Sequence, residues 1–120
     1  MEASVGTSQL GINEHKIAGA PAIRLSGRLD YATAPALRTV LLPYFSQEGL
    51  SVIMDLTGVE YADTSGLATL LEGQGRLRKS GGRMVLFGLG PQVRDLFTMN
   101  QVDRMVTIVA DEPAAAKLVS

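Results

Sequence analysis

The chain contains no cysteine, and it has a single histidine among its 120 residues. Without cysteine the protein has no disulfide framework, no thiolate metal site and no cysteine nucleophile, which suits a reducing compartment. No apolar run approaches the roughly 20 residues that a membrane-spanning helix needs, and the first residues lack the basic and apolar regions of a signal peptide. We therefore expect a cytoplasmic protein without membrane insertion.

The chain also lacks an excess of charge of either sign. It carries 11 Lys and Arg against 12 Asp and Glu, for a formal net charge of -1. No broad positive field is available to hold phosphate backbones, so we expect no direct nucleic-acid partner. One basic cluster stands out at Arg76, Arg78, Lys79 and Arg83. Two interpretations of this cluster remain open, a solvated helix end and a docking patch for a protein partner.

Hydrophobic residues make up 46% of the chain and charged residues 19%, which is typical of a globular protein. We expect one domain over residues 8–120, preceded by a flexible segment 1–7. Periodicity predicts a hairpin of strands 8–13 and 20–27, with Glu14 to Lys16 in its connection. It then predicts a helix beginning at Thr33, with Pro43 bending or ending it early. The remaining expected elements are a strand 51–56, a loop 57–63, a helix up to Gly81, a strand 84–87, a helix from Pro91, a strand 105–109 and a helix 112–119. This order, β-β-α-β-α-β-α-β-α, indicates an α/β fold with a mostly parallel central sheet, an N-terminal hairpin at its edge and helices packed on it.

The most informative segment leads from the buried strand 51–56 to the start of the next helix. There Asp63 or Thr64 can cap the helix, Ser65 falls in the first turn, and Gly66 allows another backbone to come close. A hydroxyl at a helix N-terminus lies where negative charge is favoured, so a kinase could use Ser65. The same residues also describe an ordinary helix start, and periodicity does not separate these two interpretations.

The motif Asp63-Thr64-Ser65-Gly66-Leu67 resembles the Asp-Ser/Thr-Ser-Gly-Leu signature of the STAS domain, the fold of bacterial anti-sigma factor antagonists. Other segments are similar to the same family in the same order. They are Leu25-Ser26-Gly27-Arg28-Leu29-Asp30, Val52-Ile53-Met54-Asp55-Leu56, the turn Lys79-Ser80-Gly81-Gly82, and the apolar positions Val93, Leu96 and Phe97. The resemblance covers about residues 8–119.

The resemblance implies a single STAS domain that works as a partner-switching regulator of transcription. Ser65 aligns with the phosphorylated serine of the family, and Thr64 is the second candidate for phosphorylation. Asp30, Asp63, Thr64, Ser65 and Gly66 are the implied partner-binding residues. In the family the unphosphorylated domain binds an anti-sigma factor, which is also its serine kinase, and so frees a sigma factor. The implied partners are this kinase and a PP2C-type phosphatase, and we expect a monomer or weak dimer.

The sequence allows a second class of function and argues against a third. The second class is a structural STAS module, either in a signalling scaffold or in a lipid-transport complex, because the fold alone does not determine the function. The third class is an enzyme, but Ser65 lacks the Gly-x-Ser-x-Gly elbow and His15 is expected on a surface turn. The carboxylates of Asp30, Asp55, Glu60 and Asp63 show no recognised metal-ligand spacing. We expect no catalytic residues, no metal and no cofactor.

Overall fold

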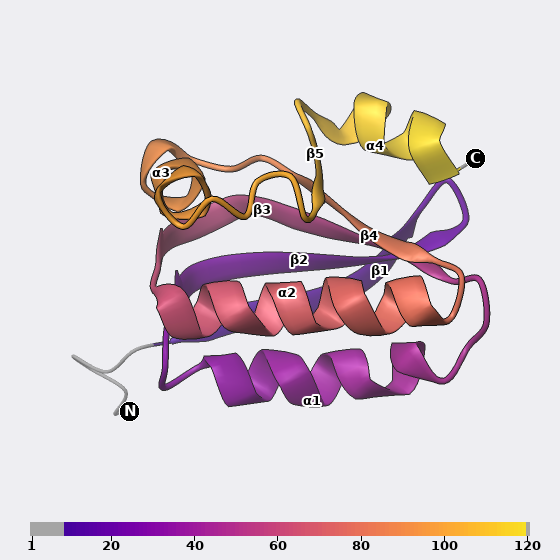
Figure 1. Ribbon diagram of the computed structural model, residues 1–120, viewed down its shortest axis with the longest axis horizontal. Coiled ribbons are helices and arrows are strands. Elements are labelled where there is room, and N and C mark those ends of the chain that lie inside the picture. The colour runs from indigo at the N-terminus through magenta and orange to yellow at the C-terminus, as the bar shows by residue number, and fades with distance from the viewer. Residues whose placement is uncertain (1–8, 120) are drawn as a thin grey trace.

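The computed structural model describes residues 9–119, so the predicted flexible segment 1–7 lies outside the described residues. The predicted element order is confirmed (Figure 1). The elements are β1 (Leu10–Ile17), β2 (Ala20–Leu29), α1 (Ala34–Phe45), β3 (Ser51–Ala62), α2 (Thr64–Lys79), β4 (Arg83–Phe87), α3 (Pro91–Met99), β5 (Thr107–Val109) and α4 (Glu112–Val119). In the part of the chain that is described, no helix is long and apolar enough to cross a membrane.

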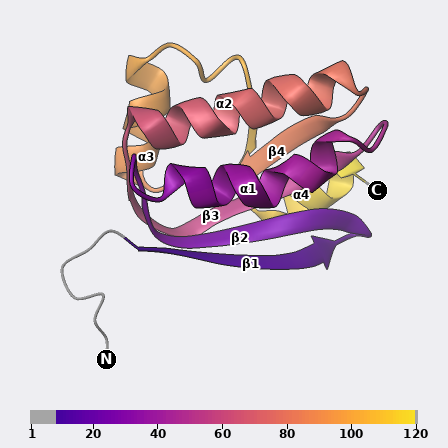
Figure 2. The same ribbon diagram turned by 90° about the horizontal axis from the view of Figure 1, so that it is seen from below.

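The five strands form one sheet in the order β1-β2-β3-β4-β5. β1 pairs antiparallel with β2, and the pairs β2–β3, β3–β4 and β4–β5 are all parallel. The helices α1 and α2 lie side by side over one face of the sheet, while α4 lies over the other face (Figures 1 and 2). The predicted mostly parallel sheet with a hairpin at its edge is therefore confirmed.

The side chains of β3 divide the core between the two faces of the sheet. Val52, Met54 and Leu56 belong to the larger cluster, which also contains the buried side chains of α1 and α2. Ile53 belongs to a smaller cluster that includes Ala115 of α4. A strand covered on both faces needs apolar residues at consecutive positions, which is why the run from Val52 to Met54 predicted a central strand.

The hairpin differs from the prediction in where its turn lies. β1 continues to Ile17, so Glu14, His15 and Lys16 lie on the strand, and all three are exposed. The turn is made by Ala18 and Gly19, whose φ angles are 52° and 83°. Two central residues with positive φ match the twist of the flanking strands, and charged side chains are common on an edge strand because they discourage pairing with another chain.

The third strand is longer than predicted. The expected loop 57–63 is mostly strand, since β3 continues to Ala62 and pairs Val59 with Gly27 and Ala62 with Leu29. The pairing of β2 with β3 shifts its register at two points. At each point β3 has one extra residue, which interrupts the alternation of its side chains between the two faces of the sheet. Because β3 extends this far, α2 begins beside the end of β2.

The first helix begins as predicted but is not stopped by its proline. α1 continues past Pro43 to Phe45. Thr33 occupies the N-cap position without a side-chain capping bond, because its hydroxyl oxygen accepts instead from the backbone N–H of Asp30 at 2.9 Å. The same hydroxyl donates to the carbonyl oxygen of Arg28 at 2.8 Å. Thr33 therefore ties the start of α1 back to β2 rather than capping the helix.

Candidate functional site

The sequence-predicted residues gather where the carboxyl ends of β2 and β3 meet the N-terminus of α2. The backbone N–H of Asp63 donates to the carbonyl oxygen of Leu29 at 3.1 Å, which brings the two strand ends together. Gly66 is buried, and a Cβ atom at this position would lie 2.5 Å from the same oxygen of Leu29. Glycine is needed here because the first turn of α2 packs directly against the backbone of β2.

Asp63 is the residue that caps α2. Its Oδ1 accepts hydrogen bonds from the backbone N–H groups of Ser65 at 2.9 Å and Gly66 at 3.0 Å. Its Oδ2 accepts from the backbone N–H of Tyr31 at 3.1 Å, in the connection between β2 and α1. One carboxylate thus satisfies two of the N–H groups that a helix start leaves without partners, and it also joins two loops.

The two hydroxyl residues of the motif differ in exposure. Thr64 is exposed and Ser65 is partly buried. Within residues 9–119 the Ser65 hydroxyl makes no hydrogen bond, whereas the Ser65 carbonyl accepts one from the Thr69 hydroxyl at 3.1 Å. Ser65 lies in the first turn, where the helix dipole stabilises negative charge. A group added to its oxygen would break no hydrogen bond within the described residues.

Asp30 lies in the adjacent connection, and its side chain is directed mainly toward its own loop. It is buried, with 4% of its surface exposed. Its Oδ1 accepts from the backbone N–H groups of Ala32 at 3.1 Å and Thr33 at 3.2 Å. Its Oδ2 lies 3.5 Å from Nε of Arg28. These contacts shape the loop that presents Tyr31, and a direct partner contact by Asp30 stays a prediction.

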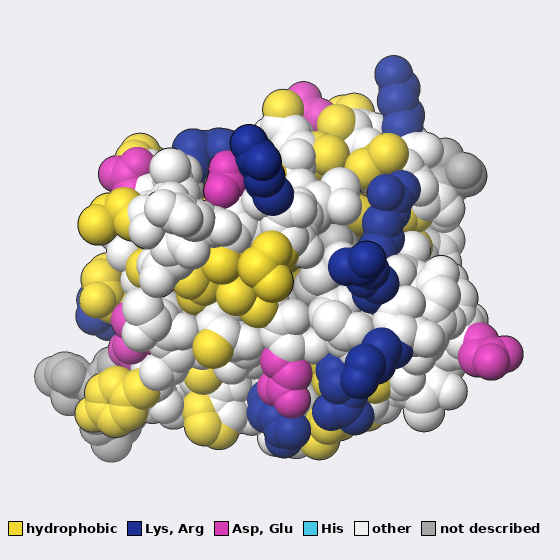
Figure 3. Space-filling view, viewed as in Figure 1, with side chains coloured by type: hydrophobic (Ala, Val, Ile, Leu, Met, Phe, Trp, Pro, Cys, Tyr) yellow, Lys and Arg dark blue, Asp and Glu magenta, His cyan; other side chains and the backbone are white. Residues whose placement is uncertain are grey.

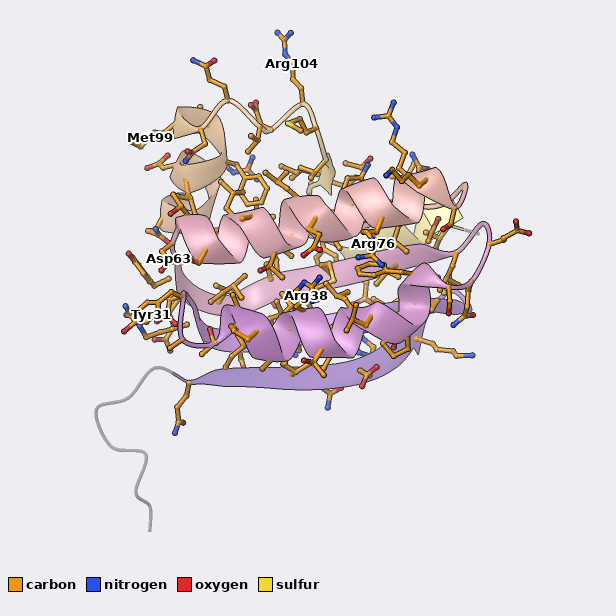
Figure 4. The ribbon with its side chains drawn as sticks, turned by 60° about the horizontal axis from the view of Figure 1, so that its bottom comes forward. Tyr31, Arg38, Asp63, Arg76, Met99 and Arg104 are labelled. Atoms are coloured by element: carbon orange, nitrogen blue, oxygen red, sulfur yellow. The ribbon has the colours of Figure 1, made fainter. Side chains whose placement is uncertain are left out.

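Two exposed apolar side chains at this end of the molecule were missed by the sequence reasoning. Tyr31 is 76% exposed and Met99, the last residue of α3, is 80% exposed. Figure 4 shows both on the same side of the domain as Asp63. A lone aromatic residue directly after Leu29-Asp30 was the available signal for Tyr31. Met99 lies outside the buried face of α3, which Val93 and Phe97 define. An apolar residue outside this face was the available signal for Met99.

Gln92 was also missed, and it links α3 to the site. Its side-chain amide donates to the carbonyl oxygen of Ala62 and accepts from the N–H of Ala62, both at 2.8 Å. Ala62 immediately precedes Asp63, so Gln92 holds the end of β3 as a neighbouring strand would. Nearby, the guanidinium of Arg28 lies 4.4 Å from the centre of the Tyr61 ring. No local sequence signal predicts these contacts between distant segments.

The acidic residues Asp30, Asp55, Glu60 and Asp63 are not placed together as a metal site. Within residues 9–119, no group of three or more His, Cys, Asp or Glu side chains is placed to hold a metal ion. The carboxylate of Asp55 instead accepts from the backbone N–H and the hydroxyl of Thr57, at 3.0 and 2.6 Å. The site therefore consists of hydroxyls, backbone N–H groups, one capping carboxylate and exposed apolar side chains, which suits recognition by another protein.

Comparison with known proteins identifies the fold and its relatives. The family model of the STAS domain matches residues 12–115. The anti-sigma-B factor antagonist of Listeria monocytogenes is 33% identical over 86 residues, which are 72% of this chain and 75% of that protein. A solved anti-sigma factor antagonist from Mycobacterium paratuberculosis has a TM-score of 0.79 at 21% identity, over 91% of this chain and 95% of that one. The unphosphorylated form of the anti-sigma factor antagonist SpoIIAA has a TM-score of 0.75 at 21% identity, over 91% of this chain and 96% of that one.

Proposed function

Because the chain belongs to the STAS domain family, we propose that it is an anti-sigma factor antagonist whose binding is switched off by phosphorylation of Ser65. The unphosphorylated protein binds an anti-sigma factor that is also its serine kinase, and thereby releases a sigma factor. A PP2C-type phosphatase restores the binding form. The protein acts in the cytoplasm by binding a partner rather than by catalysing a reaction.

The observation that carries this proposal is the junction at Asp63. Its carboxylate holds the first turn of α2, which contains Ser65, against the loop that presents Tyr31. A partner that docks on Tyr31 therefore also covers the Ser65 region. The naming of the Listeria monocytogenes relative as an anti-sigma-B factor antagonist supports the same class of partner.

The charge of a phosphoryl group explains the direction of the switch. Phosphoserine carries about -1.5 to -2 charges at neutral pH. A helix N-terminus stabilises such charge by about 0.3 to 1 kcal/mol, so the isolated domain keeps its fold. In a complex the same group is desolvated close to the carboxylate of Asp63, and we expect a penalty on the order of 2 to 5 kcal/mol. That penalty corresponds to a loss of binding of tens- to thousands-fold.

The choice of Ser65 over Thr64 rests on the family motif and on position. Thr64 is exposed, whereas Ser65 is partly buried and its backbone N–H donates to Asp63, which also accepts from the N–H of Tyr31. A partner that covers this junction encloses the Ser65 phosphoryl group, and an unpaired charge within a contact is costly. Thr64 remains a partner-binding residue and the second phosphoacceptor in this proposal.

The first experiment is mass spectrometry of the protein isolated from its own host. We expect a fraction of the molecules to carry one added phosphoryl group, and fragmentation to place it on Ser65. The same preparation identifies what co-purifies. A small ATPase-type kinase supports the regulator, whereas a membrane transporter or a very large assembly would support a structural STAS module instead.

The second experiment measures binding of the co-purified kinase to four proteins by calorimetry. We expect Ser65→Ala to bind within about threefold of the parent protein and Ser65→Asp to bind at least tens-fold more weakly. Thr39→Asp, an exposed position on α1, serves as the matched control for added charge and should bind as the parent does. If a folded Ser65→Asp protein binds as tightly as the parent, the proposed switch is wrong.

A further inference from the structure

A hollow outside the Ser65 region lies between the second half of α2 and the connection from α3 to β5. Its volume is about 360 Å³. One wall is formed by Leu71, Gln74, Gly75 and Arg78 of α2, and the other begins at Arg104 and ends at Thr107. Figure 1 shows this connection running alongside α2 on the side away from α1. Part of the basic cluster in the sequence, which the proposed switch does not use, therefore lines this hollow.

Both arginines of the hollow lack an acidic partner in the described part of the chain. Among residues 9–119, no carboxylate forms an ion pair with Arg78 or Arg104, although Asp103 is the chain neighbour of Arg104. Other arginines are engaged: Arg38 pairs with Glu72, and Arg76 lies over the ring of Phe45. Figure 4 shows Arg104 projecting outward from the connection, and its side chain is exposed.

The polar groups that line the hollow favour hydrogen-bond acceptors as ligands. Two guanidinium groups donate only. The Oε1 atom of Gln74 accepts from the backbone N–H of Met84 at 2.8 Å, which leaves the side-chain NH₂ of Gln74 to donate. The hydroxyl of the half-buried Thr107 makes no hydrogen bond within the described residues. An excess of donors with two positive charges selects an anion.

Apolar surface lies beside these donors. Val106 is buried, Leu71 is half-buried, and Met105 is 58% exposed. Figure 3 shows a hydrophobic patch near the centre of this face, with Lys and Arg side chains above it and to its right. A Cβ atom built at Gly75 would meet nothing within 4 Å, so this part of the wall is open space. A ligand with a short apolar chain would cover surface that water otherwise contacts.

We propose that this hollow binds a small organic anion, a carboxylate carrying a short aliphatic chain. Arg78 and Arg104 hold the carboxylate, and the chain lies on Leu71 and Met105. The volume falls at the lower end of the range of ligand pockets, about 300 to 1,000 Å³, so a short-chain carboxylate such as octanoate is a suitable probe. The affinity is modest, with a dissociation constant on the order of 1 mM, because the exposed side chains of Arg78 and Arg104 interact with the ligand in contact with water. This inference does not depend on phosphorylation of Ser65.

The test is a titration of the full chain with octanoate, followed by two-dimensional NMR. We expect saturable shifts of the backbone amide signals of Gly75 and Thr107. Octanamide, which has the same chain without the charge, should bind at least about tenfold more weakly, and inorganic phosphate should also bind more weakly because it lacks the chain. Shifts that do not saturate, or that centre on other residues, would overturn the site. Equal binding of phosphate would show simple attraction of anions and would overturn the proposed ligand class.

Variants separate this site from general attraction of anions. Arg78→Gln and Arg104→Gln should each weaken octanoate binding by about tenfold, since each removes one charged donor. Arg94→Gln on α3 removes an exposed arginine that does not line the hollow, and it should bind octanoate as the parent does. If Arg78→Gln and Arg104→Gln titrate as the parent does while remaining folded, the arginines do not form the site.

Discussion

The carboxylate of Asp63 accepts a hydrogen bond from the backbone N–H of Tyr31, 32 residues earlier in the chain, at a distance of 3.1 Å. The same side chain caps α2 through two further hydrogen bonds. The start of the helix that carries Ser65 and the loop that carries Tyr31 are therefore held by one residue. A substitution of Asp63 should therefore loosen both segments.

Replacing Asp63 by alanine should lower the free energy of unfolding by about 1 to 2 kcal/mol, because it removes a helix cap and the link to Tyr31. Urea unfolding followed by circular dichroism measures this loss. Asp111→Ala is the matched control, since the Oδ1 atom of Asp111 accepts one hydrogen bond, from the backbone N–H of Ala114, at an exposed site. A loss at Asp63 no larger than that at Asp111 would contradict the linking role.

Substitution of Ser65 should change stability little, whatever it does to binding. Ser65 is partly exposed, and its hydroxyl has no hydrogen-bond partner in the described part of the chain. An aspartate in the first turn of a helix is favourable by about 0.3 to 1 kcal/mol. We expect Ser65→Ala and Ser65→Asp to melt within a few degrees of the parent protein in calorimetry. A variant that unfolds would remove the basis for interpreting its binding.

Two glycines of the same helix should respond to alanine in opposite ways. At Gly66 the added Cβ would lie 2.5 Å from the carbonyl oxygen of Leu29, and we expect a destabilisation of about 1 to 3 kcal/mol. At Gly75 the added Cβ would meet nothing within 4 Å, and alanine should stabilise α2 by up to about 1 kcal/mol. Chemical denaturation of both variants provides the comparison. Similar effects at the two positions would show that α2 does not pack against β2 as described.

The phenol of Tyr44 should ionise at a higher pH than that of an ordinary tyrosine. Burial, and then its hydrogen bond to Glu14, raise the pKa of Tyr44 from 10.0 to about 12. Because the folded value is the higher one, the stabilisation from Tyr44 is complete below pH 10 and is lost as the pH rises toward 12. Ultraviolet titration of the phenolate, compared between the parent and Tyr44→Phe, measures the shift. In Glu14→Gln the pKa of Tyr44 should fall, and an unchanged value would contradict the contribution of Glu14.

The exposed ring of Tyr31 should contribute to partner binding rather than to folding. Tyr31→Ala keeps the backbone N–H that Asp63 accepts, and it removes a side chain that is 76% exposed. We expect the free energy of unfolding to change by less than about 0.5 kcal/mol and partner binding to weaken by tenfold or more, as at other aromatic hot spots. Leu42→Ala on α1, where the side chain is 40% exposed, is the control and should leave binding unchanged.

The capping role of Asp63 and the position of Ser65 in the first turn were predictable because both depend on neighbours within three residues. The contact between Asp63 and Tyr31 was not predictable in this way, and neither were the two hydrogen bonds of Gln92 to Ala62. Their partners come from other elements, and their distances depend on how strand ends align in the sheet. The extension of β3 to Ala62 has the same origin, since pairing with β2 satisfies backbone groups that local pattern assigns to a loop.

Periodicity, capping and turn chemistry act over a few neighbouring residues, so the sequence predicted the order of helices and strands, the buried central strand and the start of α2. Which side chains share a surface depends on how the elements pack in three dimensions. This packing placed Tyr31 beside Asp63, and it brought Arg78 and Arg104 to one hollow. Parallel strand pairing and helix packing bring together segments that are far apart in the chain. Local residue patterns do not indicate which of these distant segments will meet.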